Sequence, residues 1–489
     1  MNTRNRVGKA LILALCTVSI AACDRGGNST NQPGSAASDA QLAWTRQTEK
    51  QLREAIEQAP ANGLKPELFL KGELPSDDAE RYAVLTQAAL KYAEALAHGY
   101  ADPAKLNEIY SIPRPKTDIR AGLTQALQNG NVGAWLASLP PQTDEYRALS
   151  QAHLHYVKLA AQMNFQPLPA GRAIRPGSRD PRVPALAAVL AAYGYVPGQQ
   201  QPNAAAPRHY AGALVAGVKA LQSDYGLRPD GIVSGDTLDV VNLGPAGRAR
   251  QLAVAMERLR WLQRDPPKTR IDVNTAATTL DYWRDGQHID SRKVVAGEPD
   301  KQTPMLQASF SSLVANPKWR VPDSIAENEL SKKSRSWLAA NDFTIENGKY
   351  VQQSGDKNSL GLVKFDMQDK EQIYMHDTPA KALFGLPDRH RSHGCVRVEN
   401  AIQFAEMLAS QDGVLQRFED ALASGDEKWV KLKTAIPVRM LYQTAFWDGS
   451  RIQFRADVYG WDDTVAGALG FVRGQPHKQY RPQGEDIGP

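Results

Sequence analysis

No stretch of this chain carries a strong charge of one sign. The net charge is only +5, and basic residues alternate with acidic ones along all 489 residues without a dominant Lys/Arg cluster. Proteins that bind nucleic acid usually concentrate positive charge on one face or along one helix. We therefore expect no nucleic-acid partner. The length predicts two to four domains rather than a single core.

Apolar runs long enough to span a bilayer are also missing. One apolar stretch, Ala10 to Ile20, is too short for a permanent span, and it follows three positive residues, Arg4, Arg6 and Lys9. It ends in Ile20-Ala-Ala-Cys23, which resembles a bacterial lipoprotein signal. That resemblance implies a signal peptide over residues 1–23, lipid on Cys23 and a periplasmic, membrane-anchored protein. Asp24 suggests retention at the inner membrane, and an ordinary secretory signal cut nearby is the alternative.

Cysteine is scarce as well. Of the three cysteines, Cys16 leaves with the predicted signal and Cys23 carries the predicted lipid, so only Cys395 remains. A chain with one cysteine forms no internal disulfide. An unused thiol in an oxidising compartment is a liability. Cys395 is therefore the first candidate for a functional residue.

Composition and periodicity divide the rest of the chain. Residues 24–39 are rich in small and polar residues and predict a flexible tether. Helical spacing dominates residues 40–172, where no acid pair, metal spacing or nucleophile stands out, so we predict a helical scaffold. Strand patterns dominate residues 246–465, apart from a charged helical insertion at 323–355, and a tail follows at 466–489. The predicted fold class is multidomain α+β.

Individual elements can be placed within these regions. A helix is predicted from Thr143 to Leu159 with Asp144 as its N-cap, and another from Gly247 to Gln263 that bridges to the last domain. Strands are predicted at 271–273, 278–283, 293–296, 361–365, 372–376, 431–433, 438–442 and 452–454.

Residues 173–245 differ from both neighbours. They show apolar helical faces around a tight Pro229-Asp230-Gly231 turn. The stretch VKALQSDYGLRPDGIVSGDTLDVVN, residues 218–242, resembles the small three-helix peptidoglycan-binding domain. That resemblance implies a cell-wall ligand, and a helical packing unit without a ligand is the alternative. A Gln/Pro/Ala segment from Pro197 to Pro207 interrupts the match.

The segment around Cys395 has the residues that nucleophilic catalysis needs. Tyr374-Met-His376-Asp377 is followed by Arg391-Ser-His-Gly-Cys395-Val-Arg397. A thiol nucleophile requires a base and hydrogen-bond donors for the oxyanion. Gly394 lets the backbone approach a substrate, and the N–H groups of Gly394 and Cys395 are natural oxyanion donors. A helix predicted from Asn400, together with Arg391 and Arg397, should favour the thiolate.

Three histidines are candidates for the base. His393 is close to Cys395 in sequence but offers poor imidazole geometry, and His390 lies in a charged turn that we expect to be solvated. His376 ends a predicted strand, and the loop after it is long enough to return the thiol to the imidazole. A metal site of His390, His393 and Cys395 matches no common zinc spacing, so we expect no metal or other cofactor.

The spacing of His376 and Ser392-His-Gly-Cys395-Val-Arg397 resembles the signature of the L,D-transpeptidase (YkuD-type) catalytic domain. The similarity extends over about residues 250–465 and includes NPKWRVPDSIA (316–326) and NSLGLVKFDM (358–367). The order of scaffold, peptidoglycan-binding module and β-rich catalytic domain is similar to the large periplasmic branch of that family. The insertion resembles the capping subdomain of that branch but is shorter.

The resemblance implies a peptidoglycan L,D-transpeptidase. Cys395 would attack the carbonyl of the third stem residue and release D-Ala, with His376 as base and then acid. An amine of a second stem would resolve the thioester and form a 3→3 cross-link. Ser392, His393 and Gly394 would support the nucleophile. The group that orients His376 would be the backbone carbonyl of Asp377, and the Asp377 carboxylate is the alternative.

Three further residues are predicted to contact substrate. Tyr374 shares a strand face with His376 by the two-residue period. Trp319 is either a wall of the cleft or a core residue, and Arg397 either binds a stem carboxylate or forms a structural ion pair. The expected partners are peptidoglycan stem peptides, the membrane through the lipid anchor, and other cell-wall synthesis enzymes.

Two other functions use the same residues. A carboxypeptidase, or a hydrolase of lipoprotein–peptidoglycan links, would pass the same thioester to water. A non-catalytic wall-binding scaffold is the third possibility, and the intact pair of His376 and Cys395 argues against it.

Overall fold

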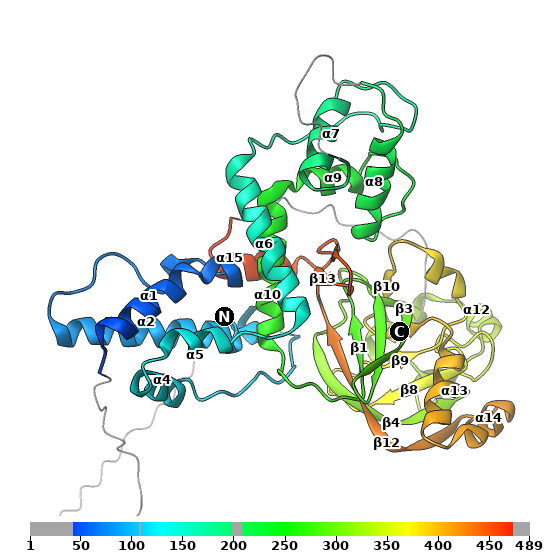
Figure 1. The fold of residues 1–489 in the computed structure, drawn as a ribbon. Coiled ribbons are helices and arrows are strands. Elements are labelled where there is room, and N and C mark those ends of the chain that lie inside the picture. The colour runs from blue at the N-terminus through cyan, green and yellow to red at the C-terminus, as the bar shows by residue number, and fades with distance from the viewer. Residues whose placement is uncertain (1–42, 107–108, 198–207, 473–489) are drawn as a thin grey trace, which may run out of the picture. The chain divides into compact units, whose positions relative to one another are not determined.

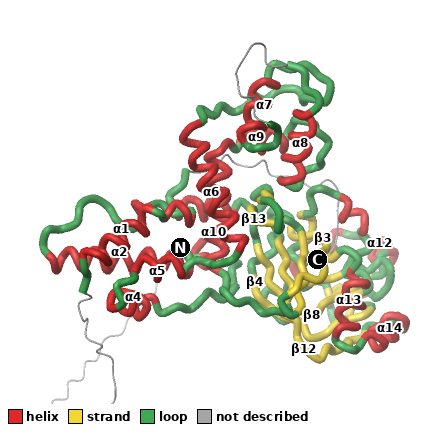
Figure 2. The backbone as a smooth tube through the Cα atoms, in the orientation of Figure 1, coloured by secondary structure: helices red, strands yellow, loops and turns green. Residues whose placement is uncertain are grey.

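The computed structural model describes residues 43–106, 109–197 and 208–472 (Figure 1). The predicted signal peptide, the lipidation of Cys23 and the tether at 24–39 lie outside the described residues, as do residues 198–207 and the end of the predicted tail. A helical N-terminal region precedes a small helical module and a β-rich C-terminal domain, which confirms the predicted α+β class (Figure 2).

The N-terminal region is built from amphipathic helices whose ends are capped by side chains. Thr45 and Thr48 form a capping box at the first helix, and Asp77 and Asp118 accept hydrogen bonds from N–H groups in the first turns of two others. The helices are α1 (Arg46–Glu57), α2 (Asp78–His98), α3 (Pro103–Leu106), α4 (Ile119–Gln128), α5 (Val132–Ser138) and α6 (Asp144–Gln162). The N-cap predicted at Asp144 is wrong, because the Thr143 side chain accepts from the Tyr146 N–H.

The small module contains the three predicted helices, α7 (Val183–Ala192), α8 (Ala213–Asp224) and α9 (Asp236–Asn242). An antiparallel bridge between Ile174 and Val233 ties its beginning to its end. Its buried residues continue into α6 and into α10 (Gly244–Trp261), so the module has no separate core.

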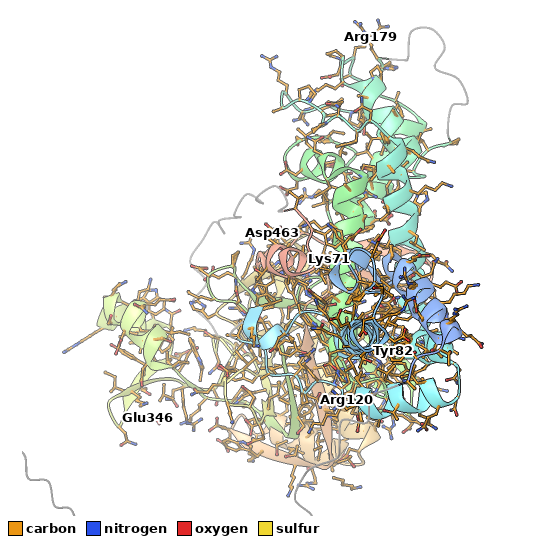
Figure 3. The ribbon with its side chains drawn as sticks, turned by 90° about the vertical axis from the view of Figure 1, so that its left-hand side faces the viewer. Lys71, Tyr82, Arg120, Arg179, Glu346 and Asp463 are labelled. Atoms are coloured by element: carbon orange, nitrogen blue, oxygen red, sulfur yellow. The ribbon has the colours of Figure 1, made fainter. Side chains whose placement is uncertain are left out.

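Helix α10 is buried on nearly every side, as the sequence did not predict. It packs against α2, α6 and α15 (Trp461–Ala468). Its buried arginines have partners: Arg258 donates to Asp462 at 2.5 Å, and Arg260 pairs with Glu257. Asp463, which Figure 3 places on α15, pairs with Arg250. The first residues of the tail predicted at 466–489 are therefore packed, since Ala466 and Leu469 are buried in the N-terminal core.

The β-rich domain is one nine-stranded sheet in the order β10-β3-β11-β9-β8-β4-β12-β1-β2. An additional pairing of β2 with β3 closes the sheet on itself. The strands are β1 (Arg270–Asn274), β2 (Thr279–Arg284), β3 (Gln287–Gly297), β4 (Leu306–Ala315), β8 (Val363–Met367), β9 (Met375–His376), β10 (His390–Ser392), β11 (Val396–Val398) and β12 (Lys428–Leu441). A separate hairpin joins β13 (Ala445–Trp447) to β14 (Ile452–Phe454).

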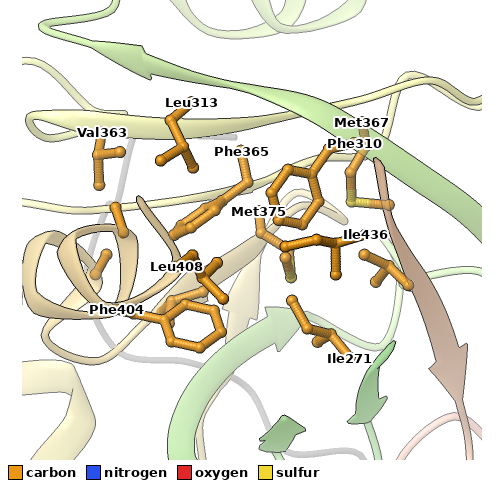
Figure 4. Close-up of a cluster of buried hydrophobic side chains, with 14 of the residues drawn as sticks. Ile271, Phe310, Leu313, Val363, Phe365, Met367, Met375, Phe404, Leu408 and Ile436 are labelled. Atoms are coloured by element: carbon orange, nitrogen blue, oxygen red, sulfur yellow. The ribbon is translucent and has the colours of Figure 1, made fainter. Parts of the chain in front are cut away.

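The core of this domain lies between the sheet and two helices, α13 (Ala401–Gln411) and α14 (Leu415–Ala423). Phe310 and Phe365 pack edge to face on neighbouring strands, and Phe404 of α13 packs against Phe365 (Figure 4). Burying such rings removes much apolar surface from water and fixes the strands relative to the helices. Met375 points into this core, which sets the orientation of its neighbour His376.

The predicted insertion contains helices and also a hairpin. It comprises α11 (Asp323–Asn328), the 3₁₀ turn Leu330–Lys332, α12 (Arg335–Ala340), β6 (Phe343–Glu346) and β7 (Lys349–Gln352), with β7 paired to β5 (Trp319–Arg320). The turn at Asn347-Gly348 has positive φ at both residues, as a tight hairpin requires. Asn-Gly is a typical sequence signal for such a hairpin, which the prediction of a purely helical insertion overlooked. Glu346 beside the turn projects outward in Figure 3.

Candidate active site

Cys395 lies in a tight turn between β10 and β11 and is 6% exposed. Two hydroxyl groups, those of Ser392 and Thr303, hold this turn through three hydrogen bonds. The Ser392 hydroxyl donates to the Cys395 carbonyl at 2.5 Å and accepts the Gly394 N–H at 3.2 Å. Thr303 donates from its hydroxyl to the Gly394 carbonyl at 2.8 Å. Gly394 has φ +117°, a conformation that favours glycine and lets the turn close.

Strand pairing brings His376 to the same face of the sheet as Cys395. Strands β9 and β11 are parallel, with Val396 opposite Met375 and Arg397 opposite His376. Because side chains alternate along a strand, Tyr374 and His376 lie on the face opposite to Met375, and Cys395 lies on the face opposite to Val396. Cys395 directly precedes β11, so this pairing places the thiol and the imidazole on adjacent segments of the same sheet.

His376 is held in one tautomer. Its Nδ1 donates to the Asp377 backbone carbonyl at 2.5 Å, so the neutral ring carries no proton on Nε2. Nε2 is buried and makes no hydrogen bond within the described residues. Burial, with positive charge on Arg397 and Lys364, lowers the pKa of His376 to about 3, although backbone groups of Asp377 and Leu360 act in the opposite direction. The imidazole is therefore neutral at physiological pH and able to accept a proton.

The Asp377 carboxylate has a different partner from the imidazole. It accepts the Leu362 N–H at 3.1 Å and pairs with Lys381. A Cβ added at Gly361 would come within 2.3 Å of this carboxylate, so only glycine fits beside it. The sequence left two groups of Asp377 open as the partner of His376. In the structure the backbone carbonyl of Asp377 bonds to the imidazole, whereas its carboxylate bonds to the loop before β8.

The resting state of the thiol differs from the one expected. Burial raises the pKa of Cys395 to about 11, while Tyr374 and Lys364 nearby act in the opposite direction. The thiol donates to the Gln372 carbonyl at 3.9 Å. The expected helix dipole does not act here, because β11 separates Cys395 from the start of α13. Cys395 and His376 therefore rest as a neutral pair.

A cleft of about 1090 Å³ opens onto the nucleophile. Tyr374, His393 and Cys395 form part of its wall, facing α11 of the insertion. The Tyr374 ring lies against the His376 imidazole with centroids 5.6 Å apart, so it separates that imidazole from the cleft. The cleft is also lined by charged residues that sequence reasoning missed, namely Lys301, Arg320, Lys349, Asp323, Glu329 and Glu371. Arg320 and Asp323 lie in the NPKWRVPDSIA stretch and Glu371 lies just before Tyr374, but no pattern of charge or spacing marked any of the six as a wall of the cleft.

Two of the predicted substrate contacts are not available to a ligand. Trp319 is fully buried in the core of the insertion, packed against Phe343, and Arg397 is 1% exposed beside His376. The core alternative is thus the one observed for Trp319. Arg397 acts on the imidazole through its charge rather than facing the cleft. Of the three predicted contacts, only Tyr374 reaches the cleft surface.

The other two histidines have structural partners. His393 bonds through Nε2 to Glu329 of the insertion at 2.5 Å. The expectation that His390 is solvated is wrong, because it is buried between the Asp388 carboxylate at 2.7 Å and the Thr275 carbonyl at 2.9 Å. Two backbone N–H groups, those of Gly394 and Cys395, were expected to bind the oxyanion. The Gly394 N–H instead donates to the Ser392 hydroxyl, which leaves the Cys395 N–H as the candidate donor.

Neither metal clusters nor membrane helices stand out in residues 43–106, 109–197 and 208–472. No group of three or more His, Cys, Asp or Glu side chains in these ranges could hold a metal ion. None of their helices combines the length and the apolar composition that crossing a membrane requires.

Comparison with known families agrees with this geometry. Residues 268–430 match the L,D-transpeptidase catalytic domain (YkuD), residues 179–241 match the family described as "Putative peptidoglycan binding domain", and residues 36–152 match a family described as "Scaffold domain". The chain therefore contains a YkuD-type L,D-transpeptidase catalytic domain together with a peptidoglycan-binding domain.

Individual relatives show the same similarity. A curated "Putative L,D-transpeptidase" from Haemophilus influenzae is 29% identical over 240 residues, which cover 44% of this chain and 49% of that protein. The chain thus spans about half the length of this relative.

Two solved structures overlap in part. An L,D-transpeptidase from Mycobacterium smegmatis is 14% identical, with 35% of this chain and 58% of that chain covered and a TM-score of 0.22. One from Stackebrandtia nassauensis is 14% identical, with 57% and 97% covered and a TM-score of 0.23. At these TM-scores the overlaps support no further conclusion about the fold.

Proposed function

We propose that this chain is a periplasmic, lipid-anchored peptidoglycan L,D-transpeptidase that forms 3→3 cross-links through a thioester on Cys395. One observation carries the proposal. A neutral imidazole with a proton-free Nε2 shares a sheet face with a thiol at the wall of a charged cleft. Thiol-dependent acyl transfer needs this combination.

The first half-reaction begins with a neutral thiol and a neutral imidazole, so the thiol must lose its proton as it attacks. His376 Nε2 takes the thiol proton as Sγ bonds to the carbonyl carbon of the third stem residue. The Cys395 N–H donates to the oxyanion that forms. When the tetrahedral intermediate collapses, the C–N bond breaks, the His376 proton passes to the departing D-Ala amine, and a thioester remains on Cys395.

The second half-reaction reverses these roles. An amine of a second stem attacks the thioester and gives its proton to His376. The C–S bond breaks, and the proton returns to the sulfur as the new amide forms. Water in place of the amine would make the same site a carboxypeptidase. The cleft contains both acidic and basic side chains, which suits an acceptor that carries an amine and a carboxylate.

Incubation of the purified protein with disaccharide-tetrapeptides, followed by mass spectrometry, tests the proposal. We expect a 3→3 dimer from the wild-type chain and none from Cys395→Ala. A shortened monomer would indicate hydrolysis, and product from Cys395→Ala would overturn the mechanism. His376→Ala should lose nearly all activity. His288→Ala is the matched control because His288 lies on the surface.

A further inference from the structure

A second cavity, of about 820 Å³, lies where three parts of the chain meet. Helix α6 contributes Tyr156, the peptidoglycan-binding module contributes Tyr193 and Tyr195, and the β13–β14 hairpin contributes Trp447 and Phe454. These five aromatic rings come from three segments, of which the first and the last lie more than 250 residues apart in the sequence. No part of the mechanism above uses this cavity.

A buried arginine fixes the aromatic wall from behind. The Arg248 guanidinium lies 3.7 Å from the Tyr193 ring centroid and 5.4 to 5.7 Å from those of Tyr156, Tyr195 and Phe454. It also donates to the Tyr156 hydroxyl at 3.0 Å. Cation–π contacts in a buried setting hold these rings in place. A wall that is rigid before binding loses little entropy when a ligand arrives.

The polar groups of the cavity balance each other in charge. The Asp224 carboxylate is buried, accepts the Tyr195 hydroxyl at 2.9 Å, and lies 3.1 Å from Nε of Arg451. Asp224 as an acceptor and Arg451 as a donor thus stand beside the aromatic rings, and Gln151, His155 and Ser450 add further groups that can form hydrogen bonds. This set suits a neutral ligand with many hydroxyl groups, whereas the catalytic cleft carries several charges of both signs.

We infer that this cavity binds N-acetylated hexosamine units of a glycan strand. The C–H faces of a pyranose ring pack on Trp447 and the tyrosines, and its hydroxyl and acetamido groups bond to Asp224 and Arg451. The identity of the natural ligand as wall glycan rests on the proposed function. Because the cavity includes the hairpin of the catalytic domain, the glycan contacts the binding module and the catalytic domain together.

Titration of the full chain carrying Cys395→Ala with tri-N-acetylchitotriose, followed by calorimetry and ligand-observed NMR, tests the inference without any turnover. We expect measurable binding that weakens roughly tenfold in Trp447→Ala, because a stacking ring is lost. Trp429→Ala is the matched control, since Trp429 is an exposed tryptophan on β12 outside this cavity. Asp224→Asn is a second variant that keeps the size of the side chain.

Unchanged binding in Trp447→Ala and Asp224→Asn, or no binding of the trisaccharide at all, would overturn the inference. Binding of a sugar-free stem peptide that is lost in Trp447→Ala would assign the cavity to peptide instead. A second measurement, the cross-linking of sugar-free tetrapeptides by wild type and Trp447→Ala, distinguishes failure of this inference from failure of the proposed function. That activity should be equal in both proteins if the cavity binds only glycan, and absent from both if the proposed function fails.

Discussion

At the scale of single residues, the reactivity of Cys395 depends on its burial. A thiol that rests protonated beside a neutral imidazole is protected from adventitious reagents, and it becomes nucleophilic only when a base removes its proton. Such protection suits the only cysteine in the described part of the chain.

This protonation state predicts slow alkylation. Burial raises the pKa of Cys395 to about 11, so the thiolate fraction at neutral pH is small. We expect the rate of modification by iodoacetamide to rise roughly tenfold per pH unit from pH 7 to pH 9. Peptide-resolved mass spectrometry measures this rate, and the same chain unfolded in urea is the control. A rate that is already independent of pH at pH 8 would contradict a raised pKa.

His376 predicts a pH-dependent contribution to stability. Its pKa is lowered to about 3 in the folded state, below the ordinary value of 6.5, so the unfolded chain binds an extra proton between these values. Stability is therefore lost as the pH falls below about 6.5, by up to about 1.4 kcal/mol per pH unit. Burial raises the pKa of Glu145 to about 7, which has the opposite sign and partly hides the effect in the wild type.

A comparison of two proteins isolates the histidine. His376→Gln does not titrate, so its free energy of unfolding relative to wild type should increase as the pH falls from 7 to 5. Chemical denaturation at each pH measures this difference. A difference that stays constant with pH would show that the folded-state pKa of His376 is not lowered.

At the scale of elements, the insertion is tied to the catalytic turn by one carboxylate. Glu329 lies just after α11 and contacts both His393 and Lys301, at 2.5 and 3.2 Å. Burial acts to raise the pKa of Glu329, but these two partners outweigh it and lower the pKa, so the carboxylate stays charged. The contact holds the wall of the cleft over the nucleophile.

Loosening this contact should affect binding more than chemistry. Glu329→Gln removes the negative charge that contacts His393 and Lys301, so the wall of the cleft formed by α11 should be held less firmly beside the nucleophile. We expect KM for the tetrapeptide to rise several-fold while kcat changes less. Steady-state kinetics test this expectation, and Glu346→Gln at the hairpin turn is the control. A fall in kcat with unchanged KM would instead place Glu329 in the chemical step.

Element-scale patterns explain which strands were predictable. β1 and β2 alternate apolar and polar residues, and both were predicted. β4 was missed because serines interrupt its apolar residues, and β10 because none of its three residues, His-Arg-Ser, is apolar. The predicted strands at 431–433 and 438–442 are one long strand, since β12 continues through a bulge opposite β4. Tertiary pairing thus overrode local propensity at these positions.

At the scale of the whole molecule, residues at the end of the described chain pack in the hydrophobic core of the N-terminal helices. Leu469 is fully buried among residues of α1, α2 and α10, and Val472 three residues later is 87% exposed. The free energy that α15 contributes is therefore part of the stability of the N-terminal helices.

This arrangement predicts a large effect far from the active site. Leu469→Ala leaves a cavity in that core and should cost about 2–5 kcal/mol of unfolding free energy. Val472→Ala should be nearly neutral because its side chain already faces solvent. Urea denaturation followed by circular dichroism compares the two. Equal stability of both variants would show that the segment after α15 does not pack in the N-terminal core.

The sequence by itself indicated the candidate thiol and imidazole and the order of the modules. Three features could be recognised without knowledge of packing, because they are local in the sequence. They are the spacing of His376 and Cys395, the glycine before the thiol, and the order of the modules. Only the tertiary structure decided the protonation of the pair, the carbonyl that orients His376, and the burial of Trp319 and Arg397. Burial and pKa depend on segments that are distant in sequence but adjacent in space, and no local pattern records those neighbours.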